Sequence, residues 1–166
     1  MKLRTFATIM KDFPEKRTLS KYAVDKMPCT IKDYMEHLIG KEISADCTFE
    51  NDDGGYLYAN RDDADKFVLI ANSGQGDEWL LNLSDQTISF LDHDEWEDIE
   101  TMRPMEISFE QFVILADLLG QFEKEYPSSR SNESGKLLQE QLRLIEKNLA
   151  WNYPFAYTDG ADGANV

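Results

Sequence analysis

The sequence lacks the residues and motifs on which most enzyme chemistry depends. Only two histidines, His37 and His93, and two cysteines, Cys29 and Cys47, occur among its 166 residues. It contains no HExxH motif, no P-loop, no Rossmann glycine pattern and no GxSxG nucleophile elbow. These absences argue against a zinc protease, a nucleotide-binding enzyme and a serine hydrolase, and they predict a protein without a cofactor. The two thiols have no CxxC spacing, which indicates a reducing compartment.

Positive charge and long apolar runs are also scarce. The chain carries 17 Lys and Arg against 32 Asp and Glu, a net charge of −15. Nucleic acid is therefore not expected as a partner, because phosphate binding needs a basic surface. No stretch approaches the ~20 apolar residues that span a bilayer, and the first residues lack a signal-peptide pattern. We expect a cytoplasmic protein that binds neither nucleic acid nor membrane.

The negative charge is concentrated in one part of the chain. Residues 41–110 carry four basic and nineteen acidic side chains, whereas residues 1–40 carry eight basic and five acidic ones. A field of this kind attracts cations or a basic protein and speeds their encounter. A solvated face that keeps the protein soluble explains the same charge equally well.

Apolar and aromatic residues are plentiful and predict a packed core. Apolar residues make up 42% of the chain, and strand-like runs at 67–71, 78–83 and 87–91 are separated by turn residues. Trp79 is expected in the core. Ser108 begins a capping box with Gln111. One apolar stripe follows on the predicted helix, formed by Phe112, Leu115, Ala116, Leu119 and Phe122.

Helices are expected before and after these strands. Residues 2–12 form a short helix, residues 16–27 a loop or a weak helix, and residues 30–40 a helix capped by Thr30. Alternating apolar residues at 43–49 predict a strand that pairs with 56–59 through the turn 51–55. The fold class is therefore α+β, an antiparallel sheet of about five or six strands with N-terminal and C-terminal helices packed on it.

The C-terminal part adds a polar connector, a helix and an aromatic segment. The connector covers 127–135, and an amphipathic helix follows from Leu138 to Leu149. Trp151, Tyr153, Phe155 and Tyr157 should dock either on the protein's own core or on a second subunit. We expect one domain over 1–126, with 127–166 packed on that same domain.

The acidic loop 92–100 is the strongest candidate site. A divalent cation bound by Asp92, His93, Asp94, Glu95 and Glu97 would make a metal-dependent hydrolase. The spacing fits no EF-hand, so a solvated loop without a metal is the simpler interpretation. Trp96 lies among these acids, where it is either a binding hot spot or a core residue. The predicted partner-binding residues are Asp92, Asp94, Glu95, Trp96, Glu97 and Asp98, together with Asp77 and Glu78.

Three segments resemble the SUKH superfamily, which includes the fungal cell-wall assembly regulator and many bacterial immunity proteins. They are the runs 76–83 (GDEWLLNL), 87–94 (TISFLDHD) and 107–112 (ISFEQF), and the similarity covers residues 67–119. Asn82 stands where the family commonly has an acidic residue.

The resemblance implies an α+β domain without enzymatic activity. Bacterial members of this type bind and neutralise a cognate toxin, often a nuclease, so the expected partner is a basic toxin domain. The fungal branch implies an alternative, a regulatory scaffold without a toxin. The oligomeric state stays open.

Overall fold

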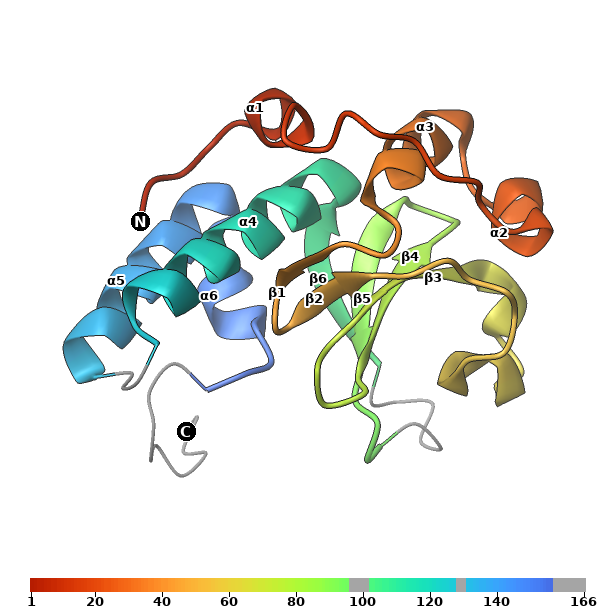
Figure 1. Ribbon diagram of the computed structural model, residues 1–166. Coiled ribbons are helices and arrows are strands. Elements are labelled where there is room, and N and C mark those ends of the chain that lie inside the picture. The colour runs from red at the N-terminus through yellow and green to blue at the C-terminus, as the bar shows by residue number, and fades with distance from the viewer. Residues whose placement is uncertain (96–101, 128–130, 157–166) are drawn as a thin grey trace.

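The computed structural model (Figure 1) describes residues 1–95, 102–127 and 131–156. Within them, six antiparallel strands form one sheet in which sequence order is also spatial order. The strands are β1 (Glu42–Ser44), β2 (Cys47–Phe49), β3 (Phe67–Asn72), β4 (Glu78–Asn82), β5 (Thr87–Leu91) and β6 (Arg103–Ser108). This meander, with helices before and after it, confirms the predicted α+β class.

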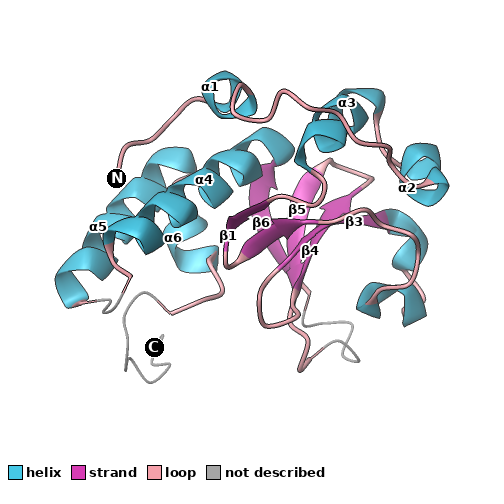
Figure 2. Ribbon diagram, in the orientation of Figure 1, coloured by secondary structure: helices cyan, strands magenta, loops and turns pink. Residues whose placement is uncertain are grey.

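The helices lie mainly on one side and along one end of the sheet, as the cyan ribbons of Figure 2 show. No helix in the described part of the chain has both the length and the apolar content needed to cross a membrane. The helices are α1 (Phe6–Met10), α2 (Lys21–Lys26), α3 (Cys29–Leu38), α4 (Phe109–Glu125), α5 (Asn132–Ile145) and α6 (Leu149–Asn152).

Helix α4 covers the sheet and forms the main core with it. Ser108 accepts from the Gln111 N–H while the Gln111 side chain accepts from the Ser108 N–H, so the predicted capping box is confirmed. All five residues of the predicted stripe are buried. A side chain at Gly120 would place its Cβ 2.2 Å from the Ile43 carbonyl oxygen. Glycine at this position therefore lets β1 lie against the helix.

The aromatic residues of the C-terminal segment dock mainly on the protein's own core. Trp79 is buried, as predicted, and its Nε1 donates to the Asp46 carbonyl oxygen at 2.7 Å. Phe155 packs edge-on against Phe90, with ring centroids 5.5 Å apart, and lies 6.3 Å from the Trp79 ring. Tyr153 is buried beside it, and its hydroxyl donates to the Asp46 carboxylate at 2.6 Å. Trp151 is 72% exposed, and Tyr157 lies outside the described residues.

The second face of the sheet is covered by the segment between β2 and β3. Tyr58 is fully buried there against Phe67, Leu69, Leu80 and Leu91. It belongs to a 3₁₀ turn, η1 (Leu57–Asn60), and a second turn, η2 (Ala64–Lys66), leads into β3. The prediction that 56–59 is a strand was therefore wrong. Strand β2 pairs with β3 instead, through Thr48 opposite Asn72 and Phe49 opposite Ala71.

Three further boundaries differ from the sequence prediction. The expected strand 43–49 is two short strands, because the chain turns at Ala45 and Asp46. Helix α3 begins at Cys29 with Pro28 as its N-cap residue, so Thr30 lies inside the helix. Ser131 caps α5 by accepting from the Ser134 N–H, so residues 132–135 of the predicted connector are helical.

Candidate functional site

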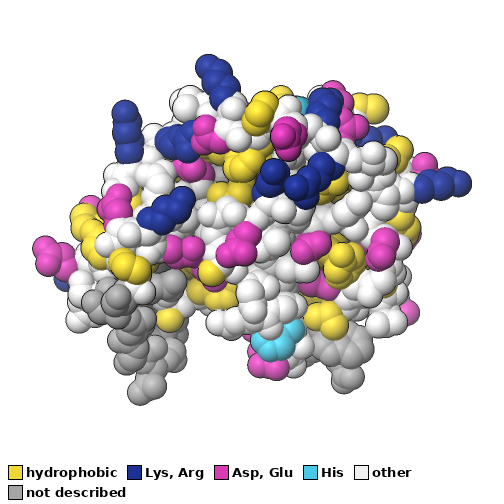
Figure 3. Space-filling view, in the orientation of Figure 1, with side chains coloured by type: hydrophobic (Ala, Val, Ile, Leu, Met, Phe, Trp, Pro, Cys, Tyr) yellow, Lys and Arg dark blue, Asp and Glu magenta, His cyan; other side chains and the backbone are white. Residues whose placement is uncertain are grey.

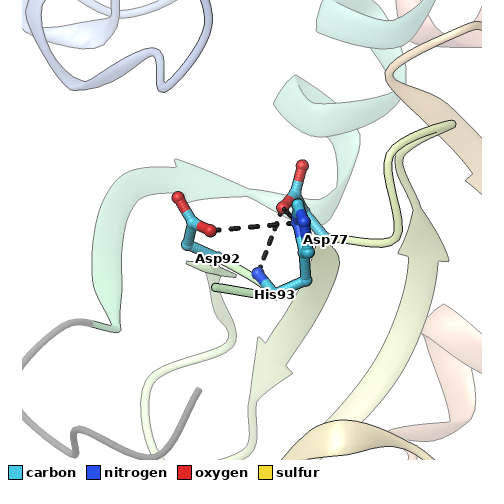
Figure 4. A group of neighbouring side chains, drawn as sticks. All are labelled: Asp77, Asp92 and His93. Carbon is cyan, nitrogen blue, oxygen red and sulfur yellow. Dashed lines mark hydrogen bonds and ion pairs between the residues drawn. The ribbon is translucent and has the colours of Figure 1, made fainter. Parts of the chain in front are cut away.

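One end of the sheet gathers acidic side chains and His93. In an antiparallel sheet, the last residue of β3, the first of β4 and the last of β5 meet at the same end. Glu78 is opposite both Asn72 and Leu91 in the strand register. Asp77, Asp92 and His93 directly precede or follow these strands, and Figure 4 shows their side chains turned toward one another. We call these three residues the Asp–His cluster.

Asp77 is the buried centre of this cluster, with 2% of its surface exposed. One carboxylate oxygen accepts from the Ser73 hydroxyl at 2.7 Å. The other accepts from His93 Nδ1 at 2.7 Å and from the His93 backbone N–H at 3.2 Å. Burial alone would raise the pKa of Asp77, but the hydrogen bonds from His93 and Ser73 outweigh it, and the pKa lies below its ordinary value.

The His93 ring contacts carboxylates on both of its nitrogens. Nδ1 binds Asp77 and lies 3.9 Å from Asp92, while Nε2 lies 3.3 Å from Asp94. The hydrogen bond to Asp77, followed by the charges of Asp94, Asp77 and Asp92, raises the pKa of His93 above its ordinary value. The ring, 38% exposed, links the β3–β4 turn to the end of β5. The three carboxylates favour the protonated form of the ring, and an imidazole that holds its proton more firmly is a weaker proton acceptor for a substrate.

The same cluster offers donors for a divalent cation. Asp77, Asp92 and His93 each supply one ligand atom, and these atoms lie within 4.8 Å of one another. Two carboxylate oxygens and one imidazole nitrogen suit Mg²⁺, Mn²⁺ or Zn²⁺. A cation on His93 Nδ1 would have to displace the proton that this nitrogen donates to Asp77.

A pocket of about 450 Å³ opens beside His93. Glu78 lines it and is 2% exposed, and its carboxylate accepts from the backbone N–H groups of Leu57 and Tyr58 at 2.7 and 3.3 Å. Burial raises the pKa of Glu78 to about 7. The pocket walls come from the Gly55–Leu57 segment and the β3–β4 turn. Its lining residues are Gly55, Tyr56, Leu57, Asn72, Gln75, Gly76, Glu78 and His93.

The structure places the predicted partner-binding residues in different environments. Asp94 is 83% exposed, Glu95 is exposed, and Asp92 is half-buried. Asp77 and Glu78, predicted to bind the partner, lie in the interior with 2% of their surface exposed, so little of either side chain is open to direct contact. Their carboxylates are stable there because His93, Ser73 and backbone N–H groups replace water as hydrogen-bond donors. Trp96, Glu97 and Asp98 lie outside the described residues.

The predicted metal cluster is only partly assembled. Asp92 and His93 come together, but the third donor is Asp77, which sequence reasoning assigned to a partner surface. Asp94 and Glu95 lie outside this donor group, and Glu97 lies outside the described residues. Ser73 was missed altogether. The spacing Ser73-x-x-x-Asp77 around two glycines was its signal, because short polar side chains hydrogen-bond across such turns.

Comparisons with known proteins add no relative to this description. No protein-family model matches the chain, and neither the curated proteins nor the solved structures compared with it gave a match. The functional argument therefore depends on the geometry and charge of the chain itself.

Proposed function

We propose that this protein is a non-enzymatic binding module that docks a basic protein at the acidic end of its sheet. The observation that carries the proposal is the exposed acidic group of Asp94 and Glu95, with half-buried Asp92, immediately after β5. The partner we propose is a toxin domain that the protein neutralises, as the resemblance to bacterial immunity proteins implies.

The local chemistry supports binding over catalysis. Within the described residues, the polar partners of the His93 ring are all carboxylates, so the ring has no hydroxyl or thiol to activate. Buried Asp77 fixes His93, and His93 in turn lies beside Asp92 and Asp94. The acids are thereby held in place before a partner arrives, and such pre-organisation favours affinity because less conformational freedom is lost on binding.

The charge distribution supports a basic partner. On the face shown in Figure 3, Lys and Arg side chains gather over the N-terminal elements at the top, and a histidine borders acidic side chains at the lower edge. This polarity suits a basic partner that approaches the lower end of the sheet in an oriented way, since opposite fields steer diffusional encounter.

The proposal is tested with the product of the neighbouring gene as the partner. We expect purified complex formation and rescue of growth when both proteins are co-expressed. In the double variant Asp94→Lys with Glu95→Lys, association should slow at least tenfold at low salt and less at high salt. The salt dependence follows because the Debye length falls from ~30 Å at 0.01 M to ~8 Å at 0.15 M ionic strength. Stopped-flow or surface-plasmon kinetics measure this rate.

The matched control is the double variant Glu133→Lys with Glu140→Lys on α5, which makes the same change in net charge at two exposed residues elsewhere. It should bind almost as fast as the wild type. Equal slowing in both double variants would mean that net charge, and not this surface, steers association. A neighbouring protein that is not toxic and does not bind would refute the immunity function.

The donor geometry of the Asp–His cluster favours a second candidate function, a metal-dependent hydrolase. This candidate predicts calorimetric binding of Mg²⁺, Mn²⁺, Ca²⁺ or Zn²⁺ at or below about millimolar concentration. The affinity should rise with pH, because the cation competes with the proton on His93. Asp92→Asn should weaken binding, whereas Asp94→Asn, outside the donor group, should not. If calorimetric titration with cation up to millimolar concentration gives no heat of binding, this candidate is eliminated.

A further inference from the structure

A second, larger pocket lies at the opposite end of the sheet. It encloses about 660 Å³ between α3, the β4–β5 turn and the junction of β6 with α4. In Figure 1, α3 lies over this end of the sheet. Its lining residues are Thr30, Ile31, Tyr34, Asp85, Gln86, Thr87, Glu106, Ile107, Ser108, Phe109, Glu110 and Gln111.

The floor of this pocket is apolar and aromatic. Ile31 and Phe109 are buried, and Tyr34 is half-buried. The Tyr34 and Phe109 rings are almost parallel, at 12°, with centroids 6.4 Å apart. The edge-on contact of Phe6 with Tyr34, at 4.7 Å between centroids, fixes the Tyr34 ring further. Such a floor accepts a methylene stem, and aromatic rings attract a cation held near their faces.

The charged groups around the pocket are acidic. Asp85, Glu106 and Glu110 line it and are exposed, and its lining includes no Lys, Arg or His. One oxygen of Asp85 accepts from the Thr87 N–H and hydroxyl, and one oxygen of Glu106 accepts from the Asn148 side chain. The Glu110 carboxylate makes no hydrogen bond or ion pair within the part of the chain that the structure describes. Each carboxylate thus retains an oxygen for a ligand.

The backbone at this pocket adopts an uncommon conformation. Gln86 and Glu106, with φ of 61° and 58°, are the two non-glycine residues with positive φ within 1–95, 102–127 and 131–156. Both line the pocket. Left-handed backbone at such residues costs on the order of 1–3 kcal/mol each and is concentrated at ligand sites.

The start of α4 in the pocket wall would by itself favour an anion, because a helix N-terminus carries about half a positive charge. Here the capping box already occupies the Gln111 and Ser108 N–H groups. Three carboxylates outweigh the half charge that remains. The acidic and aromatic lining therefore selects a cation with an apolar stem over a phosphate or a carboxylate.

We propose that this pocket binds the side chain of an arginine presented by a protein partner. The guanidinium is planar, so it stacks on the Tyr34 and Phe109 floor and donates two parallel hydrogen bonds to a carboxylate such as Glu110. Lysine offers one compact, strongly hydrated charge and fits such a site less well. The pocket is a second docking point, remote from the Asp–His cluster, and its assignment does not depend on the toxin proposal.

The test uses N-acetyl-L-arginine amide as the probe and the full chain as the receptor. Two-dimensional NMR titration should give saturable shifts at residues of this pocket, with a dissociation constant on the order of millimolar for so small a ligand. N-acetyl-citrulline amide, of nearly the same shape but neutral, should bind at least tenfold more weakly. The lysine analogue should bind with intermediate strength.

Charge removal then assigns the site. Glu110→Gln should weaken arginine-amide binding about fivefold at low salt, whereas Glu140→Gln on α5, the same change at another exposed glutamate, should leave it unaltered. Equal binding of citrulline, saturable phosphate binding in the same pocket, or no pocket shifts with the arginine probe would each overturn the proposal. The charge reversals at Asp94 and Glu95 lie at the other end of the sheet. If the arginine probe does not bind, the toxin-binding experiment with those variants can therefore still be interpreted on its own.

Discussion

Replacing Asp52 by alanine should lower the free energy of unfolding by roughly 3–5 kcal/mol. Asp52 is fully buried, and its carboxylate accepts from the Leu69 N–H at 2.8 Å, the Gly54 N–H at 2.7 Å and the Tyr58 hydroxyl. Alanine would remove the acceptor of the buried Tyr58 hydroxyl and of the partly buried Gly54 N–H, and it would leave the Leu69 N–H only the longer contact to the Tyr58 hydroxyl at 3.3 Å. A buried donor without a good acceptor costs about 1–3 kcal/mol. Urea unfolding followed by tryptophan fluorescence measures the change.

The adjacent acid provides the control for this prediction. Asp53 is exposed, and its carboxylate accepts from the Gly55 N–H at 3.1 Å. Asp53→Ala should therefore cost less than about 1 kcal/mol. Asp52→Asn, which keeps one acceptor oxygen, should be intermediate. Equal losses in Asp52→Ala and Asp53→Ala would show that the buried hydrogen bonds of Asp52 do not determine stability here.

Asp52 and Glu78 both hold the segment between β2 and β3 to the sheet, but from opposite directions. Asp52 reaches from the segment to the Leu69 backbone in β3, whereas Glu78 reaches from β4 to the first N–H groups of η1. Between them lies Gly55–Leu57, one wall of the pocket beside His93. Two buried carboxylates thus position a surface wall of the candidate site.

The parts of the fold that follow local patterns were predictable. The strands over 67–71, 78–83 and 87–91 and the helix after Ser108 have continuous or periodic apolar residues that bury one or both faces. Strand β6 was missed because its buried side is only two residues long, Met105 and Ile107, and because Pro104 stands near its start. The positive φ of Glu106 also interrupts the regular strand pairing with β5.

The parts that depend on distant partners were not predictable from local patterns. Residues 56–59 have strand-like composition, yet the Glu78 carboxylate, about twenty positions away, accepts from the first N–H groups of η1 and stabilises a 3₁₀ turn. Asp77 and Glu78 were predicted to bind a partner, yet both are buried, which is uncommon for lone acids. Their interior position depends on His93 and Tyr58, which no short-range spacing connects to them.

The last prediction concerns pH. The pKa of Glu78 is about 7 in the folded protein because burial disfavours its charge, against roughly 4.3 in an unfolded chain. Between these values the folded state binds the proton and the unfolded state does not, so stability falls as pH rises from about 4 to about 7. The loss is on the order of 4 kcal/mol and stays constant above that range.

The test compares wild type with Glu78→Gln, which keeps one oxygen as an acceptor for the Leu57 and Tyr58 N–H groups but cannot ionise. Urea unfolding at pH 4–8 should give a difference in stability between the two proteins that grows toward pH 7 in favour of the Gln variant.

Two nearby groups also titrate. The pKa of His93 is raised, so its contribution is lost above about pH 6.5, and the lowered pKa of Asp77 acts below pH 4. The contributions of His93 and Asp77 should both remain in the Glu78→Gln variant. Glu42→Gln, at an exposed residue of β1, should keep the wild-type profile. A Glu78→Gln profile parallel to wild type would show that folding does not raise the pKa of Glu78.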